Sequence, residues 1–382
     1  MLTASFLPVL ILFLLSGAGN TLIASWMDKI YVEGQKFEHP FVQCWVMFLG
    51  EASCMAVFAA RYALEKRRVQ AQGDQPIQSP WRKETLMFAI PCCCDWFSST
   101  MVYISYSYLP ASAVQMLRGS LIIFVCLISV FILKNKLYLH HFVGVGLVLV
   151  GICLVAMSSV LADDSASADG RSPLVGVFIC VTAQIFASGI MTSEEYIFKT
   201  VPNIAPIQAV GIEGTCGILI GTAILAVAQL VGVDNVKLAI YEVSHSGQAA
   251  GSCLLLACSI AVFNVCGQKI TKHISAMARS ALDSSRTILV WIAELAFGWR
   301  AFAYDTIPFW VQPFGFVFIV LGQALYFNTI KVRRLMGDEE IAEMERSLLS
   351  AEQAERSGKQ RDIRDLDIVS TTTGGSELQS QI

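Results

Sequence analysis

Long runs of apolar residues, separated by short polar segments, dominate the pattern of this chain of 382 residues. A helix needs about 20 consecutive, mostly apolar residues to cross the hydrocarbon core of a bilayer. Runs of that length give ten candidate spans, at roughly 5–26, 40–60, 84–108, 110–133, 141–161, 173–195, 206–232, 249–268, 277–299 and 307–330. The pattern therefore predicts an all-α integral membrane protein with about ten transmembrane helices.

The segments outside these runs predict the rest of the chain. Residues 61–83 are read as a polar, basic loop, and residues 331–382 as a cytosolic polar tail. Part of that tail is expected to be disordered, because its last residues are rich in Ser, Thr and Gly. The third and fourth spans are separated only by Leu109 and Pro110, so they are expected to be antiparallel neighbours.

Composition supports the membrane interpretation. Hydrophobic residues make up 55% of the chain and charged residues 15%, whereas a soluble domain carries about 25% charged residues. No basic patch indicates nucleic-acid binding. Fourteen Lys and Arg residues lie beside the spans on one side of the predicted membrane and five on the other. Because the richer side faces the cytosol, both termini are expected there.

A repeated motif predicts an internal duplication. Ser112–Arg118 and Ser280–Arg286 both read Ser-Ala-x-(Gln/Asp)-x-x-Arg, and they are 168 residues apart. The same offset places the first span on the sixth, the second on the seventh, and so on to the tenth. Since five is an odd number, the second set enters the membrane from the opposite side, as in many secondary transporters. We expect two inverted five-helix repeats, at 1–165 and 166–330.

Several longer motifs carry a resemblance to a known family. They are Asn20-Thr-Leu, His39-Pro40-Phe41 with Met47-Phe-Leu-Gly-Glu51, Asp95 with Thr100-Met-Val-Tyr103, Gln115-Met-Leu-Arg-Gly119, Ala209-Val-Gly-Ile-Glu-Gly214, Phe263-Asn264, Asp283-Ser-Ser-Arg-Thr287 and Ala324-Leu-Tyr326. With them the chain resembles the drug/metabolite transporter superfamily, and within it the nucleotide-sugar-transporter-like solute carrier family 35, subfamily F. The resemblance covers residues 5–330 and so includes every predicted span.

The resemblance implies ten helices and a carrier that works by alternating access. It also implies residence in an intracellular membrane, such as that of the Golgi, the endosome or lysosome, or the mitochondrion. It does not fix a substrate, although related carriers move nucleotide sugars. The expected function is therefore secondary-active transport of a small organic solute, with a nucleotide-sugar-like anion as one candidate.

Charged side chains at membrane depth are the first candidates for a site, because each costs at least about 2.5–3.5 kcal/mol to insert. Arg118 and Arg286 are repeat equivalents, and two guanidinium groups beside a cavity would bind a phosphate or carboxylate. Asp283 offers a competing role, because it is three residues before Arg286 and shares its helix face. Asp95 is a further cavity candidate.

Other polar residues within the spans each have more than one candidate role. Glu51, Glu213 and Asp95 are candidates for proton or cation coupling, because a desolvated carboxyl can load and release a proton. Gln115, Gln184 and Asn264 can hydrogen-bond either a substrate or a neighbouring helix. The arginines favour an anionic substrate, whereas the carboxyls favour cations or protons.

Several function classes find no support in the sequence. No phosphate-cradling loop indicates ATP-driven transport, and no catalytic triad or metal-ligand spacing indicates an enzyme, a metal site or a cofactor. The alternatives that remain are a transport-inactive membrane scaffold or binding protein, and a cation- or proton-coupled drug/metabolite exporter. The expected partners are a small-molecule substrate and membrane lipids, with a homodimer and sorting proteins that bind the tail left open.

Overall fold

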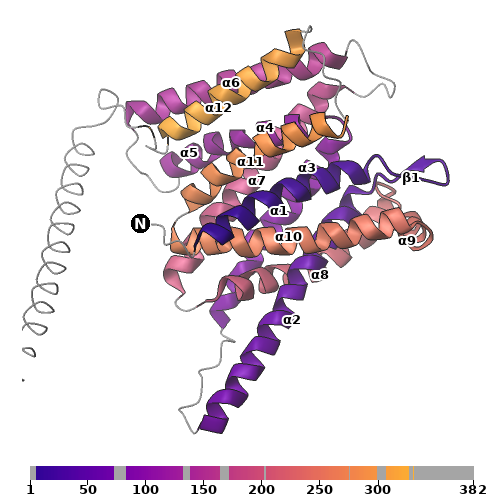
Figure 1. The fold of residues 1–382 in the computed structure, drawn as a ribbon, viewed down its shortest axis with the longest axis vertical. Helices are drawn as coiled ribbons and strands as arrows, with labels where there is room; N and C mark the ends of the chain where they lie inside the picture. The colour runs from indigo at the N-terminus through magenta and orange to yellow at the C-terminus, as the bar shows by residue number, and fades with distance from the viewer. Residues whose placement is uncertain are drawn as a thin grey trace, which may run out of the picture.

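The computed structural model describes residues 6–72, 83–131, 138–163, 172–201, 204–274, 276–298, 307–326 and 330, and this part of the chain is almost entirely helical (Figure 1). The first half contains α1 (Leu7–Met27), β1 (Tyr31–Val32), β2 (Gln35–Lys36), α2 (Pro40–Gln72), the 3-10 helix η2 (Lys83–Phe88), α3 (Ala89–Tyr106), α4 (Ala111–Leu117), the 3-10 turn η3 (Arg118–Ser120), α5 (Leu121–Phe131) and α6 (Leu139–Asp163). The second half contains α7 (Pro173–Thr200), α8 (Pro206–Val231), α9 (Val236–His245), α10 (Gly247–His273), α11 (Ala276–Ala296) and α12 (Ile307–Tyr326).

Local sequence signals set the ends of these helices. Proline occupies the first turn of α1, α7 and α8, where its missing N–H is not needed. α8 ends at Gly232, whose φ of 76° places it in the left-handed region that favours glycine. Ser246 caps α10, since its hydroxyl accepts a hydrogen bond from the Ala249 N–H.

Eight segments are long and apolar enough to cross a membrane by length and composition: Leu7–Met27, Pro40–Gln72, Lys83–Tyr106, Ala111–Ile128, Leu139–Leu161, Pro173–Thr200, Pro206–Val231 and Gly247–His273. α12 contributes a shorter apolar helix, Trp310–Tyr326. α11 does not meet the apolar criterion, because it carries four charged residues: Arg279, Asp283, Arg286 and Glu294. With α11 and α12, the described helices account for the ten crossings that the sequence predicts.

The contacts between helices follow the predicted duplication. α2 packs against α8, α4 against α11 and α6 against α12, so three pairs of repeat equivalents are in direct contact. α1 packs against α10. Their repeat equivalents, α7 and α3, also pack against each other. Figure 1 shows α6 beside α12, and α1 beside α10. Replacing each helix by its repeat equivalent thus gives the same set of helix contacts. The limits of the two repeats, 1–165 and 166–330, stay predictions.

Glycines allow the central helices to approach closely. A Cβ at Gly50 of α2 would collide with the backbone carbonyl of Ala257 in α10. A Cβ at Gly217 of α8 would collide with the ring of Phe48, and one at Gly221 would collide with Trp96. Small residues at helix contacts are a general device of membrane bundles. They allow helices of the two halves to pack closely around the rings of Phe48 and Trp96.

One end of the bundle carries two elements that the apolar runs do not predict. Glu33 and Gly34 have φ values of 50° and 87°, and a two-residue turn with two positive φ angles joins β1 to β2. The short helix α9 lies at the same end, on the opposite side of the bundle from the N terminus (Figure 1). We call this the hairpin end. Both elements escaped prediction because each is shorter than a membrane span.

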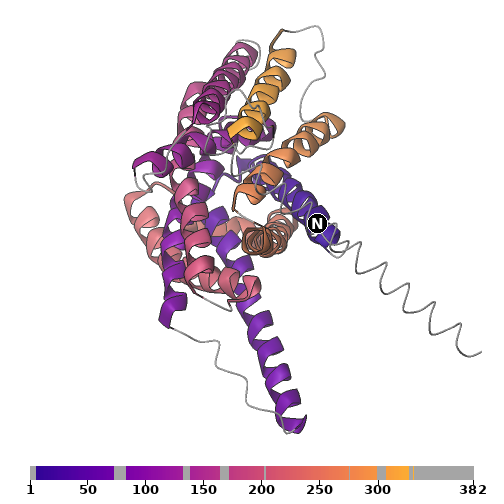
Figure 2. The ribbon, with the colours of Figure 1, turned by 90° about the vertical axis from the view of Figure 1, so that its left-hand side faces the viewer.

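The predicted loop 61–83 is wrong at residues 61–72 and at Lys83, and residues 73–82 lie outside the described part of the chain. α2 continues to Gln72, and Lys83 already begins η2. Figures 1 and 2 show the last turns of α2 extending beyond the rest of the bundle. The segment is polar, but it is rich in Ala, Leu, Glu, Lys and Arg, which are strong helix formers. The predicted tail 331–382 lies outside the described residues.

Candidate functional site

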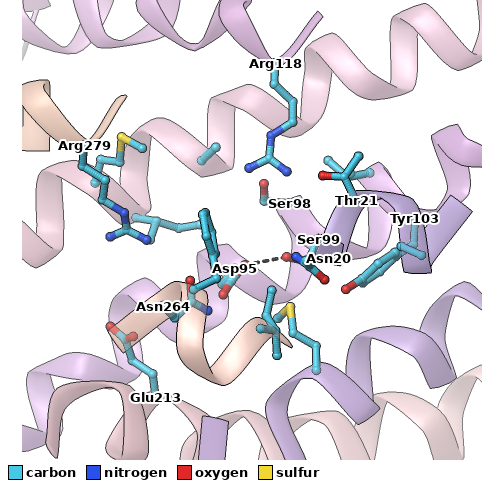
Figure 3. Close-up of a pocket in the computed structure, with 18 of the residues that line it drawn as sticks. Asn20, Thr21, Asp95, Ser98, Ser99, Tyr103, Arg118, Glu213, Asn264 and Arg279 are labelled. Carbon is cyan, nitrogen blue, oxygen red and sulfur yellow. Dashed lines mark hydrogen bonds between the residues drawn. The ribbon is translucent and has the colours of Figure 1, made fainter. Parts of the chain in front are cut away.

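A cavity of about 100 Å³ lies among helices from both halves (Figure 3). α1, α2, α3 and the α4–η3 segment line it from the first half, and α7, α8, α10 and α11 from the second. Its polar lining consists of Asn20, Thr21, Asp95, Ser98, Ser99, Tyr103, Tyr106, Arg118, Glu194, Glu213, Asn264, Arg279 and Arg286. Charged groups are costly inside a membrane bundle, so their convergence on one cavity marks the candidate site.

The structure brings five of the predicted residues to this cavity: Asp95, Arg118, Glu213, Asn264 and Arg286. The other four do not line the cavity and instead contact a helix backbone or a lining residue: Gln115, Gln184, Asp283 and Glu51. Gln115 accepts a hydrogen bond from the Thr21 hydroxyl at 3.4 Å, and Gln184 donates to the Cys180 carbonyl of its own helix at 3.1 Å. Asp283 and Glu51 hold lining residues in place, as described below.

Arg118 and Arg286 occupy equivalent positions in the two repeats but different environments. Asp283 Oδ1 lies 2.9 Å from Arg286 Nε, whereas Asp283 Oδ2 lies 3.9 Å from Arg118 Nη2. The Arg286 side chain is 1% exposed and that of Arg118 is 31% exposed. The Arg286 guanidinium also lies 4.6 Å from the centre of the Phe263 ring, a cation–π contact. Arg118 is therefore the more accessible of the two cations.

Arg286 is fitted tightly between α1 and α10. A Cβ at Gly17 of α1 would collide with Arg286 Nη1 and with the Phe263 ring. The Phe263 ring in turn stacks on Phe13, with 4.6 Å between the ring centres. This packing holds the Arg286 side chain against the wall of the cavity and limits its movement.

Two carboxyls are held by amides of α10 rather than by cations. Asn264 Nδ2 donates to Glu51 Oε1 at 2.5 Å, and Gln268 Nε2 donates to Glu213 Oε2 at 2.6 Å. The two amides are four residues apart, so they project from one face of the helix. Within the described ranges, the second oxygen of each carboxyl has no hydrogen-bond partner.

Asp95 lines the cavity from α3, and it is held differently from both of these carboxyls. Its Oδ1 accepts a hydrogen bond from the Ser99 hydroxyl one turn later, at 2.6 Å. Figure 3 shows Arg118 and Arg279 pointing toward it from two sides, without a bond to either. Asp95 is only partly buried, so its carboxyl faces the open part of the cavity.

Arg279 is a lining residue that the sequence reasoning missed. Arg279 Nη1 lies 2.5 Å from Glu194 Oε2, and both side chains are buried. Arg279 stands four residues before Asp283 and seven before Arg286, so the 3.6-residue period of a helix places all three on one face. This spacing along the sequence could have identified Arg279 as a residue on the same helix face as Asp283 and Arg286. The ion pair joins α11 to α7 away from the hairpin end.

A second buried group of charges ties the hairpin end together. His39, just before α2, lies between Asp234 and Glu242, with Nδ1 2.6 Å from Asp234 Oδ1 and Nε2 3.1 Å from Glu242 Oε2. Burial lowers the pKa of His39, but its hydrogen bond to Asp234 and the charges of both carboxylates outweigh burial and raise it. The cluster therefore favours protonated His39 and joins the two halves at this end.

A bundle of membrane-crossing helices around a charged cavity is typical of a membrane solute carrier. The family model SLC35F, described as Solute carrier family 35, matches residues 12–328. The chain is 34% identical over 333 residues to Solute carrier family 35 member F6 of Rattus norvegicus, covering 82% of this chain and 86% of that protein. The corresponding Homo sapiens protein is 32% identical over the same shares.

An uncharacterized protein of Schizosaccharomyces pombe, C12G12.12, is 31% identical over 334 residues, covering 84% of this chain and 97% of that protein. The chain belongs to solute carrier family 35, subfamily F. This is a family of multi-pass membrane transporters and not of enzymes.

Proposed function

We propose that this protein is a secondary-active carrier that moves a small organic solute with an anionic group by alternating access through the central cavity. One observation carries the proposal: Arg118 presents a partly exposed guanidinium to a cavity between the two halves. A guanidinium binds carboxylate or phosphate oxygens with two parallel hydrogen bonds. Arg286, which is buried beside it, adds positive charge to the same wall.

The size of the cavity favours a small solute. Its volume of about 100 Å³ is below the ~300–1,000 Å³ of typical ligand pockets. A nucleotide sugar would require the helices to move apart considerably, whereas a compact organic acid requires much less. Buried ion pairs lie at two levels of the bundle: Glu194–Arg279 in the lining of the cavity, and His39–Asp234 at the hairpin end.

A second candidate function, proton-coupled export, rests on the carboxyls. Glu51, Asp95 and Glu213 lie within electrostatic range of one another, and the described residues contain no ion-pair partner for any of them. Three neighbouring carboxylates in a membrane interior repel one another, so some of them would carry a proton. Release of that proton to one side of the membrane would supply the driving force for the solute.

Transport into proteoliposomes tests the carrier function. Purified full-length protein would be reconstituted, and uptake of labelled organic acids, amino acids and nucleotide sugars would be measured with and without a pH gradient. We expect saturable uptake of at least one anion-bearing solute, lost in Arg118→Ala. A Lys199→Ala variant is the matched control, because the exposed Lys199 side chain pairs with Glu195 on α7 and does not line the cavity. Absence of uptake in every condition would favour the scaffold function.

We also propose that the protein resides in an intracellular membrane and that both of its termini face the cytosol. The excess of Lys and Arg beside one set of helix ends supports this orientation. Epitope tags at the N terminus and in the Gln35–Lys36 hairpin provide the test. In cells whose plasma membrane alone is permeabilised, the terminal tag should be accessible to antibody and the hairpin tag protected. The reverse pattern would invert the proposed topology.

A further inference from the structure

Opposite charges without close partners face each other across the central cavity. Arg118 enters it from η3 and Asp95 from α3 (Figure 3). The nearest described carboxylate to Arg118 is Asp283, at 3.9 Å, and Arg286 already holds that carboxylate at 2.9 Å. Within the described residues, Asp95 is hydrogen-bonded by the neutral Ser99 hydroxyl and has no ion-pair partner. The cavity thus offers one accessible cation and one accessible anion.

Unsatisfied polar atoms extend both of these charged positions. Arg286 Nη1, next to Arg118 in the lining, is a buried donor without an acceptor in the described part of the chain. Asn20 Oδ1 is a buried acceptor without a donor among the described residues. Asn20 lines the same cavity as Ser99 and Asp95 (Figure 3). A buried polar atom without a hydrogen-bond partner costs free energy. A ligand that hydrogen-bonds to either atom would remove that cost.

These two positions place opposite demands on a solute. Arg118 donates hydrogen bonds and requires an anionic oxygen. Asp95 and Asn20 Oδ1 accept hydrogen bonds and require a cationic donor, for which a primary ammonium group offers three N–H bonds. A simple anion would satisfy the first position and leave the second unsatisfied. A simple cation would do the reverse.

We propose that the transported solute is a small zwitterion of amino-acid type, with its carboxylate on Arg118 and its ammonium group on Asp95 and Asn20. The proposal rests on the carrier function above and narrows its substrate class. It resolves the mixed charge of the lining, because a dipolar solute pairs with both signs at once. It also agrees with the cavity volume of about 100 Å³, which suits a small, compact molecule.

Thermal unfolding of the purified full-length protein tests this proposal. The probes are the common amino acids and, for each amino acid that raises the melting temperature, two analogues that lack one charge. The deaminated acid retains the carboxylate, and the amino-acid amide retains the ammonium group. A ligand that binds the folded state stabilises it by an amount that grows with the logarithm of its concentration divided by its Kd. We expect the zwitterion to produce the same rise in melting temperature at a concentration about tenfold or more below that of either analogue.

Two variants assign the two charges of the solute. Asp95→Asn should remove the advantage of the zwitterion over the deaminated acid, and Arg118→Gln should remove its advantage over the amide. Glu195→Gln, on the exposed face of α7, is the matched control and should respond as the natural protein does.

Three outcomes would overturn the proposal. Equal stabilisation by the deaminated acid would make the substrate a simple anion and leave the carrier function intact. Equal stabilisation by the amide would make it a cation, bound at the carboxyls. No stabilisation by any probe, together with an absence of uptake in proteoliposomes, would overturn the carrier function as well.

Discussion

The two repeats carry the same motif, yet their arginines have different environments. Arg286 in the second repeat is buried, with Asp283 at 2.9 Å and the Phe263 ring beside it. Arg118 in the first repeat is 31% exposed to the cavity. The cause lies three residues earlier, where the second repeat has Asp283 and the first has Gln115. A neutral amide cannot neutralise a guanidinium, so only the first repeat leaves its arginine accessible.

This difference shows where a duplicated fold acquires a site. The helix pairs α2–α8, α4–α11 and α6–α12 keep the symmetry of the duplication, because packing depends on shape and volume. The charges within them do not keep it. One repeat supplies a structural ion pair and the other an accessible cation, so the cavity can bind a solute while the bundle stays folded.

The largest expected effect comes from the buried arginine. Arg286→Ala would leave Asp283 with only the distant Arg118, and breaking a buried ion pair costs about 3–5 kcal/mol. Arg118→Ala should cost about 1 kcal/mol or less, because its pairing is loose and partly exposed. Thermal unfolding in detergent measures both. A similar loss of stability in the two variants would contradict the difference in their environments.

The next effect tests the symmetric packing. Gly50→Ala places a methyl group against the Ala257 carbonyl, where the backbone cannot move away freely, and should destabilise the bundle by about 1–3 kcal/mol. Gly251→Ala on α10 is the matched control, because its added methyl group meets no neighbouring atom. Equal melting temperatures for the two variants would mean that α2 and α10 are not in close contact.

A transplanted carboxylate tests why the two arginines differ. Gln115→Asp gives Arg118 a partner three residues earlier, as Arg286 already has. We expect an affinity for anion-bearing solutes about tenfold lower, which is about 1.4 kcal/mol, with the fold retained. Gln115→Glu, whose longer side chain changes the geometry of the pair, is the comparison variant. An unchanged affinity in Gln115→Asp would show that Arg118 does not bind the solute.

The smallest effect concerns the hairpin end. The pKa of His39 is raised in the folded protein above its ordinary value of 6.5, so its contribution to stability is complete below that value. The contribution is lost as the pH rises through the raised pKa. The melting temperature should therefore fall as the pH rises above 6.5 in the natural protein and change less in His39→Gln. His245→Gln, on the exposed end of α9, is the control; an identical pH dependence in His39→Gln would contradict the role of this cluster.

Much of the architecture could be predicted because each membrane span is a single apolar run, which can be recognised without knowledge of the rest of the chain. About 20 apolar residues are needed for a crossing, so the spans came close to the observed helices. Glu33–Gly34 and α9 escaped because nothing in their length or apolar content resembles a span. The extension of α2 to Gln72 escaped because polarity was taken as the end of the helix, whereas helix propensity continues beyond the membrane.

The candidate site was less accessible to sequence reasoning, because its contacts join distant segments. Asn264 and Glu51 are 213 residues apart, and Arg279 and Glu194 are 85 apart. Charge within a span selected Asp95 and Arg118, which line the cavity in the structure, while their role in a site stays a prediction. Which charge is neutralised and which remains accessible depends on how the helices pack, so Arg279 was missed and the two arginines looked equivalent.

The most direct test compares Arg118→Gln and Arg286→Lys in one transport assay. Both proteins would be reconstituted at equal folded content, and the uptake of labelled amino acids and organic acids would be measured against that of the natural protein. We predict that Arg118→Gln loses uptake while keeping its fold, and that Arg286→Lys retains uptake per folded molecule. Uptake that survives in Arg118→Gln and disappears in Arg286→Lys would contradict the assignment of the solute to the first repeat.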